Sequence, residues 1–393
     1  MHRERRPYVS DVPMILVRRC VLLYLLLASF SAATYAATYA APHVSLAART
    51  DNPNIVFSSG EQANAVQAAQ VALANCRKAP TSQSQTQLTG VCELTRMDDI
   101  AVTRAADLLP TAPVPLFLWR FQHDQATVYL AGTVHLLKES LYPLPQPYLD
   151  AYAATEKLVF EVDLNRYPPA EVQQQTLAYA RLAEQSLRQR LPAETYQQLV
   201  SAGMTYGLPV GQMQAFKPML AFQQLGVLGF MAMGYDPAFG IDHYFGQLGE
   251  RDAEDILQLE TLEFQLGLMF NQPLDVQTAV LQEALADLDD IEPFTSALVK
   301  AYLHGDDAAM LALIREQAGE HPLTRAFNAQ LLDQRNRGMA KTIKAYLQTN
   351  QSYLVLVGAA HTVGAKGIVA LLESAGFVAT RIASNDTLPE MRQ

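Results

Sequence analysis

Two short segments decide the fold expected for this chain, Thr127-Val-Tyr-Leu-Ala-Gly-Thr-Val-His135 and Tyr353-Leu-Val-Leu-Val-Gly-Ala-Ala-His361. In each segment an apolar run of strand length leads into a glycine, and a histidine follows three residues after that glycine. A continuous apolar run of this length is typical of a strand buried on both faces. Glycine allows a sharp turn with positive φ or a close approach of the backbone to a ligand. We therefore expect both histidines just beyond the carboxyl ends of buried strands, where open α/β sheets bind ligands.

The remaining pattern indicates strands at both ends of the chain and helices between them. Helical patterns dominate from about residue 169 to residue 318, and one long helix is expected at 323–348. Further strands are expected at residues 116–121, 157–164, 255–259 and 377–382. A short polar turn joins the first of these strands to the segment ending at His135, which predicts a β-hairpin. This order predicts an α/β (α+β-like) fold, with a mixed sheet assembled from N- and C-terminal strands around a large helical middle.

The composition is that of a globular protein. The chain has 393 residues, of which half are hydrophobic and 17% are charged, and its formal net charge is -10. An acidic surface repels the phosphate backbone of a nucleic acid. We therefore expect no nucleic-acid partner.

The N-terminus has the pattern of a secretory signal peptide. Several arginines precede an apolar run at residues 20–30, and small residues dominate 31–41. This order predicts a signal peptide at residues 1–40, cleaved between residues 33 and 41. The apolar run is shorter than the roughly 20 residues that a membrane span needs, so we expect no stable span after cleavage; an uncleaved anchor is the alternative. The predicted location is periplasmic or extracellular.

Two cysteines, Cys76 and Cys92, remain once the leader is removed. In an oxidising compartment an even pair at this spacing predicts a disulfide. The alternative interpretation is two unrelated thiols.

The cysteine pair falls in a small N-terminal segment, residues 41–110. Residues 44–60 of this segment look irregular, whereas residues 61–78 have the pattern of a helix. Three prolines between residues 108 and 115 separate the segment from the main domain, residues 116–393.

The strand expected at 157–164 contributes a candidate site carboxylate. Alternation along that strand puts Glu161 and Asp163 on one face. A carboxylate in so apolar a strand is costly unless it is paired or bound to a metal. With His135 and His361, Glu161 makes a His/Glu/His set like those of hydrolytic metal sites, which hold a divalent ion and leave a position open for water. The alternative is an edge-strand acid that faces water.

A cationic side chain is expected beside this set. Arg335 falls on the apolar side of the long helix, four residues from both Leu331 and Met339. A guanidinium in such a place needs an anionic partner, either a site carboxylate or a substrate group. The alternative is that the side chain extends along the apolar surface to water. Asn336 lies beside it on the neighbouring face.

Two further carboxylates are candidates for the site. Glu260 ends the short apolar run at 256–259, and Asp242 belongs to a third Gly-x-x-His motif, at 240–243, which follows no apolar strand. We expect Arg335 to bind a substrate carboxylate or to polarise a carbonyl, and Asp163 or Glu260 to act as general base.

Several of these motifs together resemble the TraB/PrgY/GumN family, and in particular its GumN-like bacterial branch. The resemblance runs in matching order from about residue 116 to residue 382. The motifs include Val128-Tyr-Leu-Ala-Gly-Thr-Val-His135, Glu161-Val-Asp163, Gly240-Ile-Asp242, Arg335-Asn336 and Val357-Gly-Ala-Ala-His-Thr-Val-Gly364. The family includes the TIKI proteins, which are metal-dependent proteases acting outside the cell, and PrgY, which is linked to blocking a peptide pheromone. The resemblance implies that the two histidines and the Glu161 position form the site.

These observations predict an exported metal-dependent hydrolase of the peptidase class, acting on a peptide or protein substrate. The alternative is a non-catalytic protein that sequesters a peptide or assists envelope polysaccharide production. A third hypothesis is a haem protein with His135 and His361 as axial ligands, although the sequence has no haem-attachment motif.

Overall fold

The computed structural model describes residues 41–79, 90–316, 318–319 and 321–388. The predicted signal peptide, residues 1–40, lies outside the described residues. Within them, no helix combines the length and the apolar character that crossing a membrane requires.

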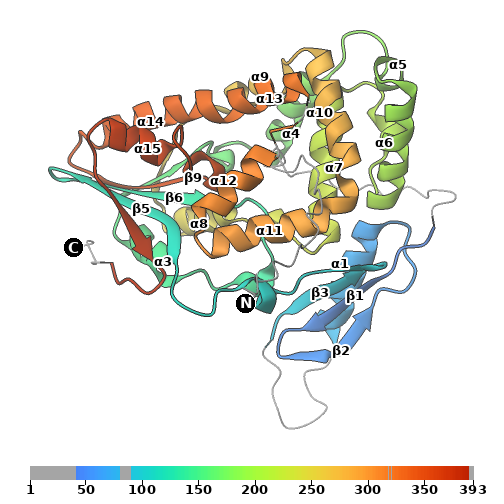
Figure 1. Cartoon of the computed structure of the whole chain (residues 1–393), viewed down its shortest axis with the longest axis horizontal. Coiled ribbons are helices and arrows are strands. Elements are labelled where there is room, and N and C mark those ends of the chain that lie inside the picture. Colours follow the sequence, from blue (N-terminus) through green and yellow to red (C-terminus); the bar gives the residue numbers. More distant parts are fainter. Residues whose placement is uncertain (1–40, 80–89, 317, 320, 389–393) are drawn as a thin grey trace, which may run out of the picture.

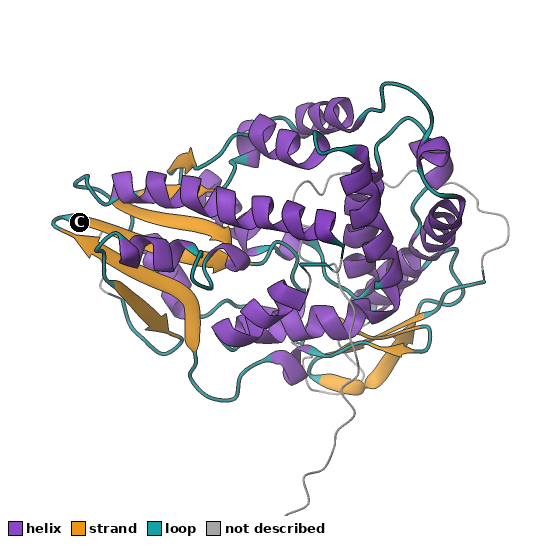
Figure 2. Cartoon of the chain, turned by 45° about the horizontal axis from the view of Figure 1, so that its top comes forward, coloured by secondary structure: helices purple, strands orange, loops and turns teal. Residues whose placement is uncertain are grey.

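A six-stranded mixed sheet forms the part of the molecule that positions the site (Figures 1 and 2). Its strands lie in the order β10-β5-β6-β9-β7-β8. Four neighbours, β6, β9, β7 and β8, are parallel, whereas β5 pairs antiparallel with both β6 and β10. The strand bounds are β5 (Pro115–His123), β6 (Ala126–Thr133), β7 (Lys157–Phe160), β8 (Asp255–Gln258), β9 (Ser352–Gly358) and β10 (Ala379–Ala383).

Strands β6 and β9, both predicted as buried strands, lie next to each other at the centre of this sheet. Every residue of β6 and β9 is buried, which explains why both strands are apolar without alternation. β5 and β6 form the predicted hairpin. The parallel register pairs Thr133 with Gly358 and Phe160 with Leu356, so the carboxyl ends of β6, β9 and β7 lie level with one another.

The middle of the chain is helical, as expected, and helices cover both faces of the sheet (Figure 2). The helices of this main part are α3 (Gln146–Ala153), α4 (Pro169–Ala180), α5 (Leu187–Arg190), α6 (Ala193–Tyr206), α7 (Pro218–Ala232), α8 (Ile241–Arg251), α9 (Leu262–Phe270), α10 (Leu274–Ala286), α11 (Ile291–Leu303), α12 (Asp307–Glu316), α13 (Pro322–Ala329), α14 (Arg335–Tyr346) and α15 (Ile368–Ser374).

Two elements differ from their predicted extents. The strand expected to reach residue 164 ends at Phe160, and the chain continues into a single 3₁₀ turn at Leu164–Arg166. The long helix expected at 323–348 consists of α13 and α14, joined by a π-helical turn at Gln330–Gln334. Such π turns add a residue to a helix and often occur at functional sites; this one ends directly before Arg335.

The N-terminal part forms a second, four-stranded antiparallel sheet with helix α1 (Ala65–Lys78) packed on it (Figure 1). The predicted disulfide between Cys76 and Cys92 is present and joins α1 to β3. The expectation of irregular structure at 44–60 is wrong, because β1 and β2 form a hairpin there. The strands lie in the order β2-β1-β3-β4, with bounds β1 (Ser45–Arg49), β2 (Asn52–Ser58), β3 (Cys92–Met97) and β4 (Ile100–Ala101).

A buried lysine ties the linker after this small sheet to the main part. Lys138 is 3% exposed, and its ammonium donates to the Thr103 carbonyl at 2.6 Å, just before the short helix α2 (Ala105–Leu108). The same ammonium lies 4.7 Å from the centre of the Tyr235 ring. Burial lowers the pKa of Lys138 to about 8. Glu292 of α11 accepts a hydrogen bond from the Thr103 backbone N–H at 2.8 Å. Both backbone polar groups of Thr103 therefore form hydrogen bonds with side chains of the main part.

Candidate active site

Four of the predicted site residues follow the carboxyl ends of four adjacent parallel strands. His135 follows β6, His361 follows β9, Glu161 follows β7 and Glu260 follows β8. Because neighbouring parallel strands end at the same edge of a sheet, residues from distant parts of the sequence meet there. The sheet order therefore brings these side chains into one cluster.

The carboxylate of Asp242 orients the imidazole of His135. The backbone N–H of Ile241 donates to the Val134 carbonyl at 3.0 Å, which docks the start of α8 against the turn after β6. Asp242, in the first turn of α8, then places Oδ2 2.6 Å from Nδ1 of His135. Its other oxygen accepts the Thr133 hydroxyl at 2.9 Å. This arrangement puts the ring proton on Nδ1 and leaves Nε2 for the site.

Gly240 is required for this approach of α8. A Cβ at Gly240 would lie 2.3 Å from the carbonyl oxygen of His135, so only glycine lets the helix start so close to the turn. His243, the histidine of the same Gly-x-x-His motif, is exposed and contacts Gln247 instead. The motif therefore contributes its aspartate to the cluster, and its histidine lies outside.

Asn336 orients the imidazole of His361. The Asn336 amide nitrogen donates to the Lys366 carbonyl at 2.8 Å, which turns the amide oxygen toward His361, 2.6 Å from Nδ1. An amide oxygen only accepts hydrogen bonds, so Nδ1 of His361 carries the proton. Burial lowers the pKa of His361 to about 3, and the ring is therefore neutral with the lone pair of Nε2 facing the site.

The two histidines differ in their electrostatic setting. Burial is the largest single influence on the pKa of His135 and lowers it, but the charge and hydrogen bond of Asp242 together with the charge of Glu161 outweigh burial, and the pKa is raised. The His135 side chain is 20% exposed, whereas that of His361 is 5% exposed. His135 is therefore the imidazole closer to solvent.

A buried guanidinium connects the two carboxylates of the cluster. Arg335 is 6% exposed, and its Nη2 donates to Glu161 and, at 2.8 Å, to Glu260. Its Nε donates to Glu260 at 2.9 Å, and Nη1 lies 3.2 Å from Nε2 of His361. The amide of Gln265 donates to Glu260 at 3.0 Å. Glu260 is thus the principal anchor of the guanidinium.

Glu161 is an ionised carboxylate in spite of its burial. Burial alone raises its pKa, but Arg335, His361 and His135, together with the backbone N–H of Gly358, hold it well below its usual range. The Gly358 N–H donates to Oε1 at 2.6 Å, and Nε2 of His361 lies 3.7 Å from that oxygen. The carboxylate therefore presents a full negative charge to both imidazoles.

Gly358 lies at the centre of the three candidate metal ligands. A Cβ built there would be 3.4 Å from Oε1 of Glu161, 3.4 Å from Nε2 of His135 and 3.6 Å from Cδ2 of His361. Its backbone has φ -52° and ψ 135°, which any residue can adopt. Neither Gly358 nor Gly132 uses a positive φ, and a Cβ at Gly358 would make contacts of ordinary length.

Gly358→Ala is expected to keep the fold and to impair metal retention. The added methyl makes ordinary contacts but occupies the space between the three side chains, so an ion shared by them is excluded. Metal content of the purified variant and its thermal unfolding measure the two effects, with Gly338→Ala on α14, where a Cβ meets nothing within 4 Å, as control. Unchanged metal content in Gly358→Ala contradicts the expectation.

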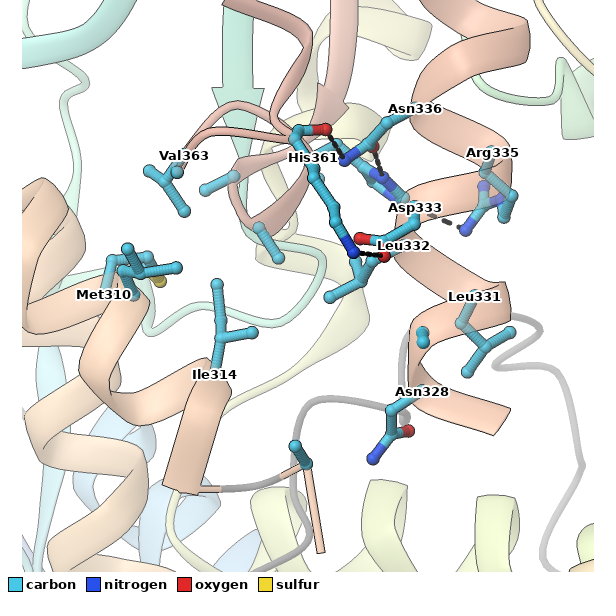
Figure 3. Close-up of a pocket in the computed structure, with 18 of the residues that line it drawn as sticks. Met310, Ile314, Asn328, Leu331, Leu332, Asp333, Arg335, Asn336, His361 and Val363 are labelled. Atoms are coloured by element: carbon cyan, nitrogen blue, oxygen red, sulfur yellow. Dashed lines mark hydrogen bonds and ion pairs between the residues drawn. The ribbon is translucent and has the colours of Figure 1, made fainter. Parts of the chain in front are cut away.

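The cluster forms one end of a cavity of about 510 Å³. His135, Glu161, Arg335, Asn336 and His361 line it, and most of the remaining lining is apolar. Figure 3 shows Arg335 and Asn336 on α14 beside His361, with Met310 and Ile314 of α12 across the cavity. The cavity thus gives a ligand access to the cluster.

Asp163 does not join the cluster. Because β7 ends at Phe160, the alternation that predicted Glu161 and Asp163 on one face stops before either residue. The Asp163 backbone N–H donates to Gln258 at 3.2 Å, the residue begins the 3₁₀ turn that follows, and it is absent from the cavity lining. Burial raises its pKa. Glu260 also lies outside the lining and reaches the cluster through Arg335.

The cluster contains the kinds of atoms that bind a divalent metal ion. The imidazoles of His135 and His361 direct Nε2 toward the ionised carboxylate of Glu161, and the Nδ1 atom of each ring faces an oxygen acceptor, as is usual for metal-binding histidines. Among the described residues, however, no group of three or more His, Cys, Asp or Glu side chains stands in an arrangement that would hold an ion. The Arg335 guanidinium contacts both Glu161 and His361.

The sequence alone did not define the roles of two residues in the cluster. Asp242 was a candidate without a partner, and Gln265, which supports Glu260, was not identified. The signal for Asp242 was present in the third Gly-x-x-His motif, whose glycine and aspartate are the residues that the structure uses.

Comparisons with known proteins agree with the family resemblance of the sequence motifs. The family model described as TraB/PrgY/gumN matches residues 117–381. An 80-residue stretch is 35% identical to a protein named "Metalloprotease TIKI homolog" from Amphimedon queenslandica, covering 20% of this chain and only 16% of that relative. No solved structure matches the chain significantly. Since the family model covers well over half of the sequence, the chain belongs to the TraB/PrgY/gumN family.

Proposed function

We propose that this protein is an exported metal-dependent hydrolase that cleaves peptides, with a divalent ion held by His135, Glu161 and His361. The observation that carries the proposal is the pairing of the two imidazoles. Each has Nδ1 against an oxygen acceptor, Asp242 at 2.6 Å and Asn336 at 2.6 Å. Each therefore directs Nε2 toward the same ionised carboxylate, and in this structure Nη1 of Arg335 lies 3.2 Å from Nε2 of His361.

When bound, the ion would supply a Lewis acid that lowers the pKa of a water molecule and polarises a carbonyl. Asp242 and Asn336 hold the ring orientations and the tautomers that ligation requires. Arg335 contacts two carboxylates, those of Glu161 and Glu260. If the contact with Glu161 is lost, the guanidinium remains bound to Glu260 through Nε and Nη2. Glu161 can therefore serve an ion while the guanidinium stays in the site.

Arg335 and Glu260 have proposed parts in substrate turnover. The guanidinium, anchored by Glu260, faces the cavity and can bind a substrate carbonyl or carboxylate. Neither Asp163 nor Glu260 lines the cavity, but Glu260 contacts Arg335 of the cluster, so it is the better placed of the two candidates for the general base. Its contacts with Arg335 and Gln265 hold it in place for that role.

Two kinds of observation support the peptidase class and export. The similar stretch in the protein named as a metalloprotease supports a proteolytic activity. The arginine-rich leader with its apolar run and the disulfide between Cys76 and Cys92 support an oxidising compartment outside the cytoplasm.

The proposal is tested by metal analysis of the purified protein, followed by incubation with a peptide library with and without a chelator. We expect about one divalent ion per chain, cleavage of library peptides, and loss of that cleavage on chelation with recovery when the ion is returned. Tight peptide binding without turnover, indifferent to chelator, would instead support the non-catalytic sequestering protein. Cleavage that persists after complete metal removal contradicts metal dependence.

A further inference from the structure

The cavity extends from the cluster along one continuous helical wall. Thr324 and Asn328 of α13, Leu331 of the π turn, and Arg335 of α14 all line it. A helix rises about 1.5 Å per residue, so the wall from Asn328 to Arg335 is about 10 Å long. That length matches about three residues of extended peptide at roughly 3.3 Å each.

The walls of the cavity are mostly apolar, although the ion pair of Lys366 with Asp333 and the side chains of Arg315 and Arg325 also line it. Leu331 and Leu332 project from the π turn, Met310 and Ile314 from α12, and Val363 from the loop after β9 (Figure 3). Met310 is 1% exposed, Leu331 6% and Val363 7%. A cavity of about 510 Å³ with such walls would accept a bulky apolar side chain.

One polar group on the helical wall lacks a partner. Thr324 lines the cavity and is 1% exposed, and its hydroxyl has no hydrogen-bond partner within the part of the chain that the structure describes. A buried hydroxyl left unpaired costs roughly 1–3 kcal/mol. Because the hydroxyl oxygen is itself shielded, a peptide backbone would satisfy it only once the Thr324 side chain turns toward the cavity, whereas a hydrocarbon chain would not satisfy it at all.

We infer that the cavity is the binding site for a short extended peptide segment whose bulky apolar side chain lies between α12 and the π turn, next to the bond that the cluster would cleave. The inference rests on the proposed function for the cleavage step, and the binding step stands separately. The substrate class is a peptide with leucine, phenylalanine or a similar residue beside the scissile bond. The space between α12 and the π turn, called the apolar subsite below, is joined to Arg335 by the continuous helical wall, so one peptide can contact both the subsite and Arg335.

The test measures binding in the absence of cleavage. Blocked pentapeptides that differ only in a central Leu, Phe, Ala or Asp are titrated by calorimetry into the full chain carrying His135→Ala. We expect the Leu and Phe peptides to bind at least about tenfold more tightly than the Ala peptide, since burying a large apolar side chain is worth more than 1.4 kcal/mol. The Asp peptide should bind more weakly than the Leu and Phe peptides, because a carboxylate gains nothing from the apolar part of the walls. Equal affinity for the Leu and Ala peptides overturns the inference.

Two substitutions place the subsite within the cavity. Ile314→Trp fills the space between α12 and the π turn, and should remove the preference for Leu and Phe. Met204→Trp on α6, where the side chain is 39% exposed, should leave it unchanged. Because a tryptophan can also disturb packing, Ile314→Ala is the second variant, and should shift the preference from Leu toward Phe. A preference that survives both Ile314 variants overturns the inference.

The Thr324 hydroxyl gives an independent readout. Thr324→Val keeps the shape and removes the hydroxyl, and should weaken all four peptides to a similar extent, by roughly three- to tenfold. A fatty acid of similar length that binds where no peptide does overturns the inference. If the Leu and Phe peptides bind as expected but the wild-type chain cleaves neither, the subsite stands and the hydrolase proposal falls.

Discussion

His135→Ala is expected to lose its metal ion and its peptide cleavage together. Removing Nε2 of His135 takes away the ligand nearest solvent, and leaves Glu161 and His361 as a two-residue set. Substitutions next to metal ligands typically cost about 10–100-fold in metal affinity or activity, so loss of a ligand itself should cost at least about 100-fold. Metal content and kcat/KM on a cleaved library peptide measure both quantities.

The matched control for this substitution is His243→Ala. His243 sits in the third Gly-x-x-His motif but is exposed and contacts only Gln247 among the partners that the structure describes. The His243→Ala variant should retain metal and activity. The Asp242→Asn variant should have a metal content and an activity between those of His135→Ala and His243→Ala, because the substitution weakens the orientation of His135 without removing a ligand. Full activity of His135→Ala with an intact fold would defeat the proposed function.

Arg335→Met is expected to cause the largest loss of stability among single substitutions in the cluster. The guanidinium is the buried cation between Glu161 and Glu260. Removing one partner of a buried ionic network leaves uncompensated charge and typically costs about 3–5 kcal/mol. Denaturant unfolding at pH 8, in the presence of a chelator, measures the free energy of unfolding. Arg337→Met, which changes an exposed neighbour on α14, should cost little.

The Arg335→Met effect should also depend on pH in a defined direction. In the wild-type chain the pKa of Glu161 is held below its usual range, so its contribution to stability is present above the ordinary carboxyl pKa and is lost as the pH falls. In the variant, burial without the guanidinium raises that pKa, so stability is lost as the pH rises. The difference between the two proteins should therefore shrink on acidification from pH 8 to pH 5. An equal difference at both pH values would show that the loss comes from packing.

The central part of the fold could be predicted because its pattern is local and strong. The apolar runs of β6 and β9 are long enough to identify buried strands, and the polar turn between β5 and β6 identifies a hairpin. The hairpin of β1 and β2 was missed because Asn52-Pro-Asn54 opens an exposed edge strand, where burial imposes no apolar pattern. Proline and asparagine at such a position are also typical of loops.

Part of the cluster could also be predicted from a local sequence pattern. A histidine that follows a buried strand is placed by that strand, so His135 and His361 could be singled out from sequence. The expected alternation through Asp163 did not hold because nothing in the sequence marks the end of β7 at Phe160. The contact of Asp242 with His135 depends on how α8 docks against the turn after β6, and no local pattern encodes such packing.

The sheet order also fixes when the cluster can exist. β9, which lies between β6 and β7 in space, comes near the end of the chain, so β6 and β7 have no shared neighbour until it arrives. A nascent chain that has been synthesised only to just beyond β8 contains His135, Glu161 and Glu260 but neither Arg335 nor His361. The complete cluster can therefore form only after β9 has joined the sheet.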